Sequence, residues 1–272
     1  ADLRRLRPAG DCLEVRDVGP TPGGRRLPML VITDFSSPAR RPHVVISARV
    51  HPGEAPASYM MRGVLQVLLS RAEASRALRR DFVFVVFPML NPDGVAAGNV
   101  RCNLAGRDLN RCWEHPPAAS EVEAVKAELS ALHAGGCEML ALVDLHAHSR
   151  RHGAFTLSNP GCVALPDLLA GAGGALFDRG GCTFGAPRAK RGSARCVAWR
   201  ELGVAHAHTV EATYARYPRR GREVEPRDLE EFGRRLALAL PALRPEPEAA
   251  PEAEAAPSLR QRRRAKRGSA AA

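Results

Sequence analysis

The 272-residue chain has 45% hydrophobic residues and a formal net charge of +11 at pH 7. This apolar content lies in the range of globular proteins, and no apolar run approaches the ~18 residues that a membrane-spanning helix needs. The seven cysteines are odd in number and form no C-x-x-C pair, which argues against a disulfide framework or a zinc ribbon and favours free thiols in a reducing compartment such as the cytoplasm. The positive charge indicates a polyanionic partner, which composition leaves open between nucleic acid, an acidic membrane and an acidic peptide.

Short apolar runs alternate with helix-like periodicity between residues 10 and 243. The run FVFVVF at residues 82–87 is continuous, which is typical of a strand with both faces covered by helices. The alternation predicts an α/β sandwich, in which reactive groups gather at strand ends and in the loops that follow them. The expected strands are Met29–Thr33, His43–Ala48, Phe82–Phe87, Met139–Leu145 and Val204–Ala212. The expected helices are Pro56–Ser70, Val122–Leu132 and Asp228–Leu240, the last with Asp228 as its cap.

The end of the chain differs in composition from the rest. From Arg244 onward the sequence is low in complexity, first acidic and then basic, with almost no large apolar side chains. Such a segment buries too little surface to offset the entropy of ordering, so residues 244–272 are predicted to form a disordered tail. The basic run at residues 262–267 fits either a solvated tail or a patch for nuclear import or nucleic-acid binding, and composition favours the first.

Histidines and acids gather in short segments. In the first, His51 and Glu54 are separated by Pro-Gly, which forces a turn between an expected strand and an expected helix. A turn can aim both side chains at one point, and an imidazole with a carboxylate is a common start of a Zn²⁺ site. In the second, His146 closes an expected buried strand and shares a strand face with Asp144 and His148. A third ligand there would leave one position open, as in catalytic zinc sites, although surface imidazoles would give the same pattern.

A third segment places Glu211 in an expected apolar strand. His208 and Glu211 repeat the H-x-x-E spacing, but an odd offset along a strand puts them on opposite faces. A carboxylate in such a strand is costly unless it has a charged partner or a function. Beside a zinc-bound water, Glu211 would act as a general base.

The loop between residues 91 and 111 is rich in arginine and opens with the turn signal Asn-Pro-Asp-Gly. A guanidinium suits a carboxylate in bidentate geometry and can stabilise an oxyanion. The alternative is that these arginines are solvated loop residues, which is the usual environment of Arg.

Taken together and in order, these segments resemble the zinc carboxypeptidase family. They are most similar to its cytosolic carboxypeptidase branch, which trims glutamates from protein tails, notably tubulin. The resemblance covers about Met29 to Leu240 and is carried by RVHPGEAPASYMMRG, FVFVVFPMLNPDGVAAGNVRCNLAGRDLNR, DLHAHSR, RGSARCVAWRELGV and HTVEATY. It implies a mixed, mostly parallel central β-sheet with helices on both faces.

The resemblance also implies a zinc-dependent metallocarboxypeptidase with one Zn²⁺ per chain. The metal ligands would be His51, Glu54 and His146. Asp108 matches an acid that orients a zinc-bound histidine, a role that makes independent physical sense.

The same resemblance implies roles for the residues that act on the substrate. Glu211 would be the catalytic base, and Arg101 would stabilise the developing oxyanion. Asn110 and Arg111 would grip the terminal carboxylate of the substrate. Arg195 matches a basic position that the branch uses for an acidic side chain.

Three features depart from the family pattern. The branch carries a β-rich domain before the catalytic one, so residues 1–243 are expected to form the catalytic domain, with the end of a preceding domain within residues 1–25. The stretch Arg150–Thr183 is short and rich in Gly and Ala, which leaves the rim of the pocket undefined. The mobile tyrosine that digestive members carry before the catalytic glutamate has no counterpart, because no Tyr lies between Tyr59 and Tyr214.

Three functions remain open from the sequence. The leading hypothesis is hydrolysis of the C-terminal bond of acidic tails such as polyglutamylated tubulin, favoured by the net charge and Arg195. A related zinc amidohydrolase that deacylates a small N-acyl amino acid would use the same arginines for its carboxylate. A basic protein that binds nucleic acid or acidic tails without chemistry is less favoured, because no nucleic-acid-binding motif is recognisable and Glu211 would be unexplained.

Overall fold

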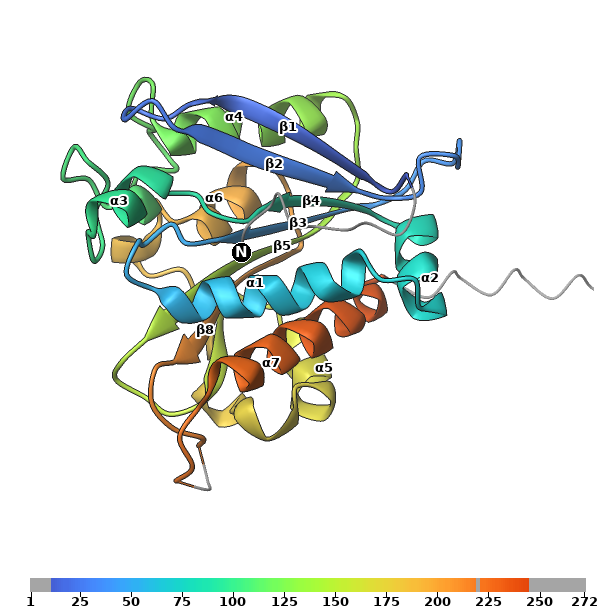
Figure 1. Cartoon of the computed structure of the whole chain (residues 1–272), viewed down its shortest axis with the longest axis vertical. Coiled ribbons are helices and arrows are strands. Elements are labelled where there is room, and N and C mark those ends of the chain that lie inside the picture. The colour runs from blue at the N-terminus through green and yellow to red at the C-terminus, as the bar shows by residue number, and fades with distance from the viewer. Residues whose placement is uncertain (1–10, 219–220, 245–272) are drawn as a thin grey trace, which may run out of the picture.

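The computed structural model describes residues 11–218 and 221–244, which fold around one eight-stranded sheet (Figure 1). The strands are β1 (Leu13–Pro20), β2 (Arg26–Ile32), β3 (His43–Ala48), β4 (Val83–Phe87), β5 (Met139–His148), β6 (Ala154–Ser158), β7 (Thr183–Phe184) and β8 (His206–Thr213). Their order in the sheet is β1-β2-β4-β3-β5-β8-β6-β7. The central strands β4, β3, β5 and β8 run parallel, while β1, β2 and β6 join by antiparallel pairing.

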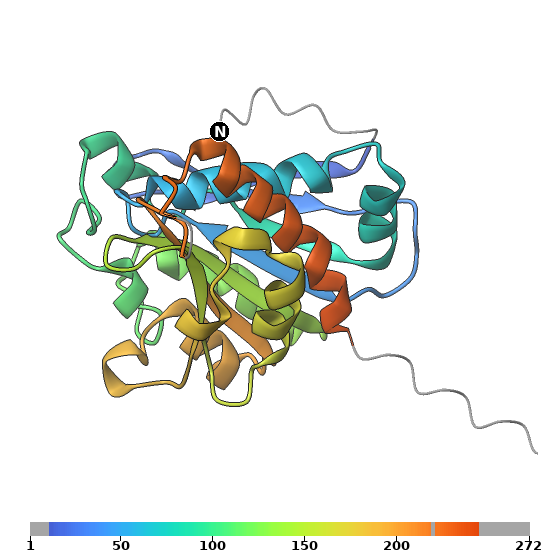
Figure 2. The ribbon, with the colours of Figure 1, turned by 90° about the horizontal axis from the view of Figure 1, so that it is seen from below.

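Helices cover both faces of this sheet. The α-helices are α1 (Ala55–Leu68), α2 (Glu73–Asp81), α3 (Pro92–Ala97), α4 (Glu121–Ala134), α5 (Ala164–Ala172), α6 (Ala194–Glu201) and α7 (Pro226–Ala239). Short 3₁₀ helices are η2 (Leu109–Arg111), η3 (Gly174–Leu176), η4 (Arg179–Gly181), η5 (Arg188–Lys190) and η6 (Leu240–Leu243). Helices α1, α5 and α7 pack on one face, and α4 and α6 pack on the other (Figures 1 and 2). This arrangement confirms the predicted fold class.

The central strands are apolar throughout because each face meets a layer of helices. In β4, Phe84 and Val86 belong to the core beneath α1 and α7, whereas Val85 and Phe87 belong to the core beneath α4 and α6. The alternation follows from the two-residue period of a strand.

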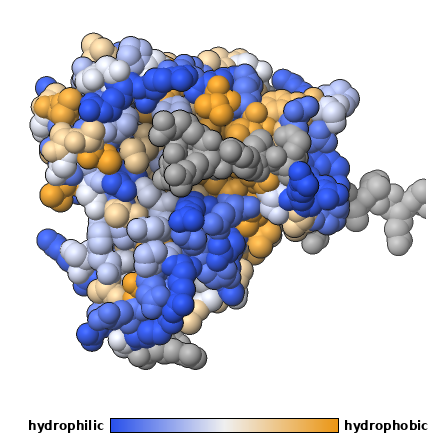
Figure 3. Space-filling view, in the orientation of Figure 1, coloured by the Kyte–Doolittle hydropathy of each residue, from blue (hydrophilic) through white to orange (hydrophobic). Residues whose placement is uncertain are grey.

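Helices α1 and α7 lie in direct backbone contact through two glycines. A β-carbon at Gly63 would lie 1.9 Å from the carbonyl oxygen of Glu230, and one at Gly233 would lie 2.0 Å from that of Met60. These distances are far below van der Waals contact, so the close approach requires glycine at both positions. The outer side of α7 is hydrophilic (Figure 3), so this helix docks through its apolar stripe.

Several details differ from the sequence-based expectation. The patterns did not predict the strands β1, β6 and β7, two of which lie at the edges of the sheet, or the helices α2, α3, α5 and α6. Asp228 is not the cap of α7, because Pro226 takes the first helical position and Glu225 precedes it as the N-cap. The carboxylate of Asp228 instead accepts the backbone N–H of Glu225 at 2.9 Å, as in a capping box.

The first described residues belong to the same sheet as the rest of the domain. β1 pairs with β2 as an edge strand, and the turn between them is held by the buried Asp93, which accepts hydrogen bonds from Thr21 Oγ1 and Gly23 N. The segment from Leu13 to Ile32 thus forms the β1–β2 edge of the described sheet. The predicted tail, with its basic run, lies outside the described residues from position 245 onward. Among the helices that the structure describes, none has the length and apolar character needed to cross a membrane.

Candidate metal centre and active site

The candidate site lies where the parallel strands β5 and β8 end. In the register of this pair, His146 lies opposite Glu211 and Asp144 lies opposite Thr209. Residues opposite each other in a sheet point to the same face, here the face that α4 and α6 cover. His208 points to the other face, where its Nδ1 lies 2.8 Å from Ser158 Oγ, so the register confirms that His208 and Glu211 diverge.

The turn that follows β3 carries two candidate ligands. Arg49 has a φ of 58°, a left-handed conformation that is uncommon for a residue with a side chain. Its guanidinium reaches across the turn and donates to the carbonyl oxygen of Pro52 at 2.7 Å. The buried side chain of Asn91 donates to another carbonyl of the turn at 3.2 Å. These bonds offset the backbone strain and hold His51 at the strand ends, with Glu54 immediately before α1.

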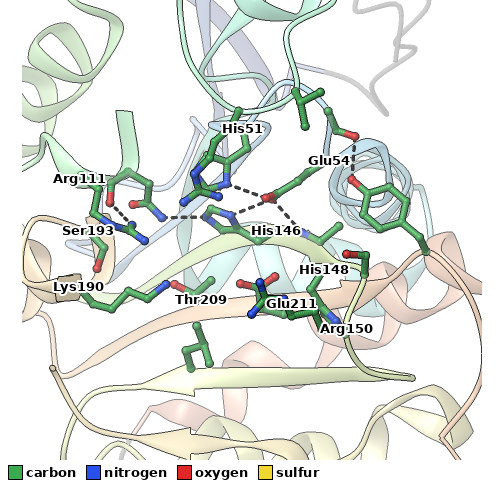
Figure 4. A pocket seen from close by; sticks show the side chains of 18 of the residues that line it. His51, Glu54, Arg111, His146, His148, Arg150, Lys190, Ser193, Thr209 and Glu211 are labelled. Atoms are coloured by element: carbon green, nitrogen blue, oxygen red, sulfur yellow. Dashed lines mark hydrogen bonds and ion pairs between the residues drawn. The ribbon is translucent and has the colours of Figure 1, made fainter. Parts of the chain in front are cut away.

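His51, Glu54 and His146 converge at one point (Figure 4). Nδ1 of His51 lies 2.7 Å from Oε1 of Glu54, and Nδ1 of His146 lies 2.9 Å from Oε2. Their ligand atoms lie within 4.8 Å of one another, and no other such group of His, Cys, Asp and Glu occurs in residues 11–218 and 221–244. The structure thus brings the three predicted metal ligands together.

A carboxylate holds the outer nitrogen of each imidazole. Nε2 of His51 lies 3.1 Å from Oδ1 of Asp108, and Nε2 of His146 lies 2.5 Å from Oδ2 of Asp144. Asp144 is itself buried and accepts a hydrogen bond from Ser47 Oγ at 2.7 Å. Such carboxylates fix the ring and its tautomer, so the proton stays on Nε2 and Nδ1 is available to a metal.

Negative charge dominates this cluster. Burial disfavours charge on His146, but the carboxylates of Asp144 and Glu54 raise its pKa well above the ordinary value. Burial acts to raise the pKa of Glu54, yet the neighbouring His146 and His51 hold it far below the usual range. A divalent cation would supply the positive charge while both imidazoles stay neutral. Two imidazoles and one carboxylate fit Zn²⁺ with one position open.

Arg101 reaches this cluster through Asp108. Its Nε and Nη2 lie 2.8 and 2.7 Å from Oδ2 of Asp108. The backbone N–H of Gly53 donates to the carbonyl oxygen of Val100 at 2.8 Å, and a β-carbon at Gly53 would lie 2.9 Å from the same oxygen. The Arg101 side chain remains 47% exposed at the mouth of the site, where it can face a substrate oxygen.

Asn110 and Arg111 lie on another wall of the site. Oδ1 of Asn110 accepts the backbone N–H of Ala194 at 3.0 Å, which fixes the orientation of the amide. Nδ2 of Asn110 lies 3.2 Å from Nε2 of His146. Because that Nε2 carries the proton donated to Asp144, it cannot accept, and Nδ2 keeps its hydrogens for a ligand. Arg111 donates from Nη1 to the carbonyl oxygen of Asn110 at 2.8 Å, and its other N–H groups, which have no hydrogen-bond acceptor among the described residues, are available to the pocket.

Glu211 faces the cluster from β8. Its Oε2 has no hydrogen-bond partner among the described residues. Burial raises the pKa of Glu211, and the negative charge of Glu54 raises it further. The positive charge of His146 acts in the opposite direction but does not outweigh burial. A carboxylate with a raised pKa and an unpaired oxygen, beside a candidate metal centre, is suited to act as a general base.

A pocket of about 550 Å³ opens over these residues, and every predicted ligand, catalytic and substrate-binding residue except Asp108 lines it. In Figure 4, Arg111, Ser193 and Lys190 lie to the left of His146, whereas His148 and Arg150 lie below it and to its right. These two groups of residues define a direction through the pocket, from Arg111 past the candidate metal ligands to Arg150.

Lys190 and Arg195 differ in how they meet this pocket. Arg195 is buried, with Nη1 donating to Asn159 Oδ1 at 2.6 Å and Nη2 donating to the carbonyl oxygen of Gly185 at 3.0 Å. Lys190 also lines the pocket, but its ammonium group has no ion-pair partner in the described part of the chain. Burial lowers the pKa of Lys190, and the charge of Arg111 adds to that effect. Arg195 is therefore a fixed part of the wall, and Lys190 is a cation free to meet a ligand.

Sequence reasoning missed several residues of this site. Tyr214 donates its hydroxyl to the carbonyl oxygen of Gly53 at 2.7 Å, and burial together with Glu54 raises its pKa to about 12. Its position three residues after Glu211, within the matching stretch HTVEATY, was a usable signal. Lys190 ends the short 3₁₀ helix η5, and the sequence around it shows no pattern that would have marked it as a site residue.

Comparisons with known proteins agree with this geometry. The sequence model of the zinc carboxypeptidase family (Peptidase_M14) matches residues 3–148. The chain is 35% identical to cytosolic carboxypeptidase 1 of Danio rerio, over 84% of this chain and 23% of that protein. It is also 35% identical to cytosolic carboxypeptidase 4 of Mus musculus, over 81% of this chain and 23% of that protein. The chain thus spans less than a quarter of the length of these relatives.

Solved structures show the same fold. A metallo-carboxypeptidase from Burkholderia cenocepacia superposes with a TM-score of 0.75 at 23% identity, covering 88% of this chain and 66% of that one. Carboxypeptidase A from Helicoverpa armigera superposes with a TM-score of 0.63 at 17% identity, covering 86% of this chain and 68% of that one. On the family match, the identity to its relatives and the shared fold, the chain belongs to the zinc carboxypeptidase family.

Proposed function

We propose that this chain is a zinc metallocarboxypeptidase that removes C-terminal glutamate from acidic protein tails, such as polyglutamylated tubulin. The observation that carries the proposal is the combination of a His-Glu-His cluster, the unpaired carboxylate of Glu211 and a free cation, Lys190, in one pocket. The similarity to proteins named cytosolic carboxypeptidases supports the branch and a cytoplasmic location.

His51 and His146 would hold one zinc ion per chain through Nδ1, together with the carboxylate of Glu54. Zinc supplies Lewis acidity that brings the pKa of a water molecule towards ~7. Glu211 accepts a proton from the attacking water and then returns it to the leaving amine. Arg101, already anchored by Asp108, donates hydrogen bonds to the oxyanion that develops on the scissile carbonyl.

The restriction to chain ends follows from Asn110 and Arg111. The amide of Asn110 is fixed with Nδ2 facing the pocket, and the guanidinium of Arg111 is positioned by its bond to the neighbouring backbone. Together they offer donors for the two oxygens of a terminal carboxylate. An internal peptide bond presents no such group, so it would not be held.

The preference for glutamate rests on Lys190, with Arg195 in a supporting role. Lys190 lies on the same side of the cluster as Arg111, where the side chain of the terminal residue would lie (Figure 4). Arg195 adds positive potential from its fixed position in the wall. An acidic side chain there would meet an ammonium group that has no ion-pair partner among the described residues and on which the more distant charge of Glu211 also acts.

The test is release of the last residue from a matched peptide set. Peptides share one body and end in Glu, Gln or Leu, and a fourth peptide ends in Glu with its terminal carboxylate converted to an amide. We expect release of Glu to be fastest and the amidated peptide to resist. Equal release from the amidated and free peptides would contradict the role of Asn110 and Arg111, and equal rates for Glu and Leu would contradict the substrate assignment.

A further inference from the structure

The pocket fixes the direction in which a substrate must lie. If Asn110 and Arg111 hold the terminal carboxylate, the residues before the cleaved bond must leave on the opposite side of the metal ligands. His148 and Arg150 lie away from Arg111, below and to the right of His146 in Figure 4. The surface beyond them is therefore where the upstream part of a substrate would pass.

This surface contains a second hollow that shares a wall with the first. It has a volume of about 430 Å³ and follows the loop after β5. Arg150 lines both the active-site pocket and this hollow, so the two adjoin at that residue. The other residues of the hollow are Arg151, His152, Asp178, Gly180, Gly181 and Pro218.

The hollow is positively charged. Arg150 makes no ion pair in the described part of the chain. Arg151 is held in place, because Nη1 donates to the carbonyl oxygen of Gly181 at 2.8 Å and the guanidinium lies 4.8 Å from the centre of the Phe155 ring. Asp178 brings the single carboxylate of this lining, and its Oδ1 already accepts the backbone N–H of Gly180 at 3.1 Å.

We propose that Arg150 and this hollow form a subsite for acidic side chains upstream of the cleaved bond. The proposal rests on the proposed function and adds a requirement to it: the enzyme reads a run of acidic residues and not the terminal one alone. An extended peptide advances ~3.3 Å per residue, with alternate side chains on the same side. A tail of consecutive glutamates therefore presents a carboxylate to Arg150 in each register as the tail is shortened.

The test compares two peptides that end in the same Glu-Glu pair and differ upstream, one with four Glu and the other with four Gln. We expect the wild-type ratio of kcat/KM, acidic over neutral, to be about tenfold, and Arg150→Gln to lower this ratio about threefold to fivefold. Arg150→Glu should favour a third peptide with four upstream Lys. Raising NaCl from ~0.05 to ~0.5 M should shrink the wild-type ratio, because the contact is electrostatic.

Arg71→Gln is the matched control, since it removes the same charge beyond the far end of α1, and that 14-residue helix spans ~21 Å. Binding of the same peptides to Glu211→Gln protein gives a second readout that does not depend on turnover. A wild-type ratio near one, or a ratio that Arg150→Gln and Arg71→Gln change equally, would overturn the subsite while leaving glutamate release intact. Hydrolysis of neither peptide by wild type would refute the proposed function, and the subsite with it.

Discussion

Replacing Lys190 by Met tests how the pocket selects a terminal residue. The change removes the ammonium group and keeps an unbranched side chain of similar length. Opposite unit charges 4 Å apart interact by ~4 kcal/mol at an effective dielectric constant of 20. Part of that is lost to desolvation, and hydrogen bonds to charged groups contribute a net ~1.5–3 kcal/mol. The preference for Glu over Gln should therefore fall by about 10-fold to 150-fold.

The assay is kcat/KM for two peptides that differ only in a terminal Glu or Gln, which have nearly the same shape. Lys190→Arg should keep most of the preference, because it keeps the charge. Arg195→Met should change the preference less but lower the melting temperature, since it removes the guanidinium donor from the carbonyl oxygen of Gly185 and from Asn159 Oδ1, which keeps only the weak donor Cys196 Sγ at 3.6 Å. The reasoning is refuted if Lys190→Met keeps the wild-type preference while Arg195→Met abolishes it.

Three further predictions follow from the same contacts. Gly233→Ala puts a β-carbon 2.0 Å from the carbonyl oxygen of Met60, so it should lower the free energy of unfolding by ~1–3 kcal/mol. In a thermal unfolding experiment the melting temperature should fall by ~2–10 °C. An unchanged melting temperature would mean that α1 and α7 do not pack this closely. Arg101→Ala should lower kcat ~10²–10³-fold with the zinc content unchanged, and normal turnover would remove Arg101 from the mechanism. Because burial lowers the pKa of Lys190, its charge is lost at a lower pH than that of an ordinary lysine. The preference for Glu over Gln should therefore decline as the pH rises from 7 to ~10 in wild type but not in Lys190→Arg, whose guanidinium stays charged. A parallel decline in both proteins would exclude the titration of Lys190 as the cause.

The sequence was informative where chemistry and secondary structure coincide. The apolar run FVFVVF predicted β4 because a strand covered on both faces must be apolar on both. His51 and Glu54 were recognisable because they lie in the turn between β3 and α1, and His146 because it lies near the end of β5. The parallel register of β5 and β8 then brings Glu211 beside His146, which a strand assignment alone could not establish.

Other features depended on contacts that a sequence does not display. Asp228 resembles a helix cap by its position, but Pro226 fixes an earlier start for α7. Arg195 is held in the wall by hydrogen bonds to Asn159 and Gly185, whereas Lys190 has no such acceptors among the described residues. These acceptors are not close neighbours of Arg195 in the sequence, so no local pattern reveals the difference. The positive hollow beside Arg150 joins the loop after β5 to the turn around η4, two segments that only the fold brings together.

The central claim is that His51, Glu54 and His146 hold a zinc ion that works with Glu211. The most direct measurement is the zinc content and glutamate release of wild type, of Glu211→Gln, and of wild type treated with a chelator, on one peptide that ends in several Glu. We predict one zinc ion per chain in wild type and in Glu211→Gln, with glutamate released by untreated wild type alone. Wild type without zinc, or Glu211→Gln that releases glutamate at the wild-type rate, would contradict the account.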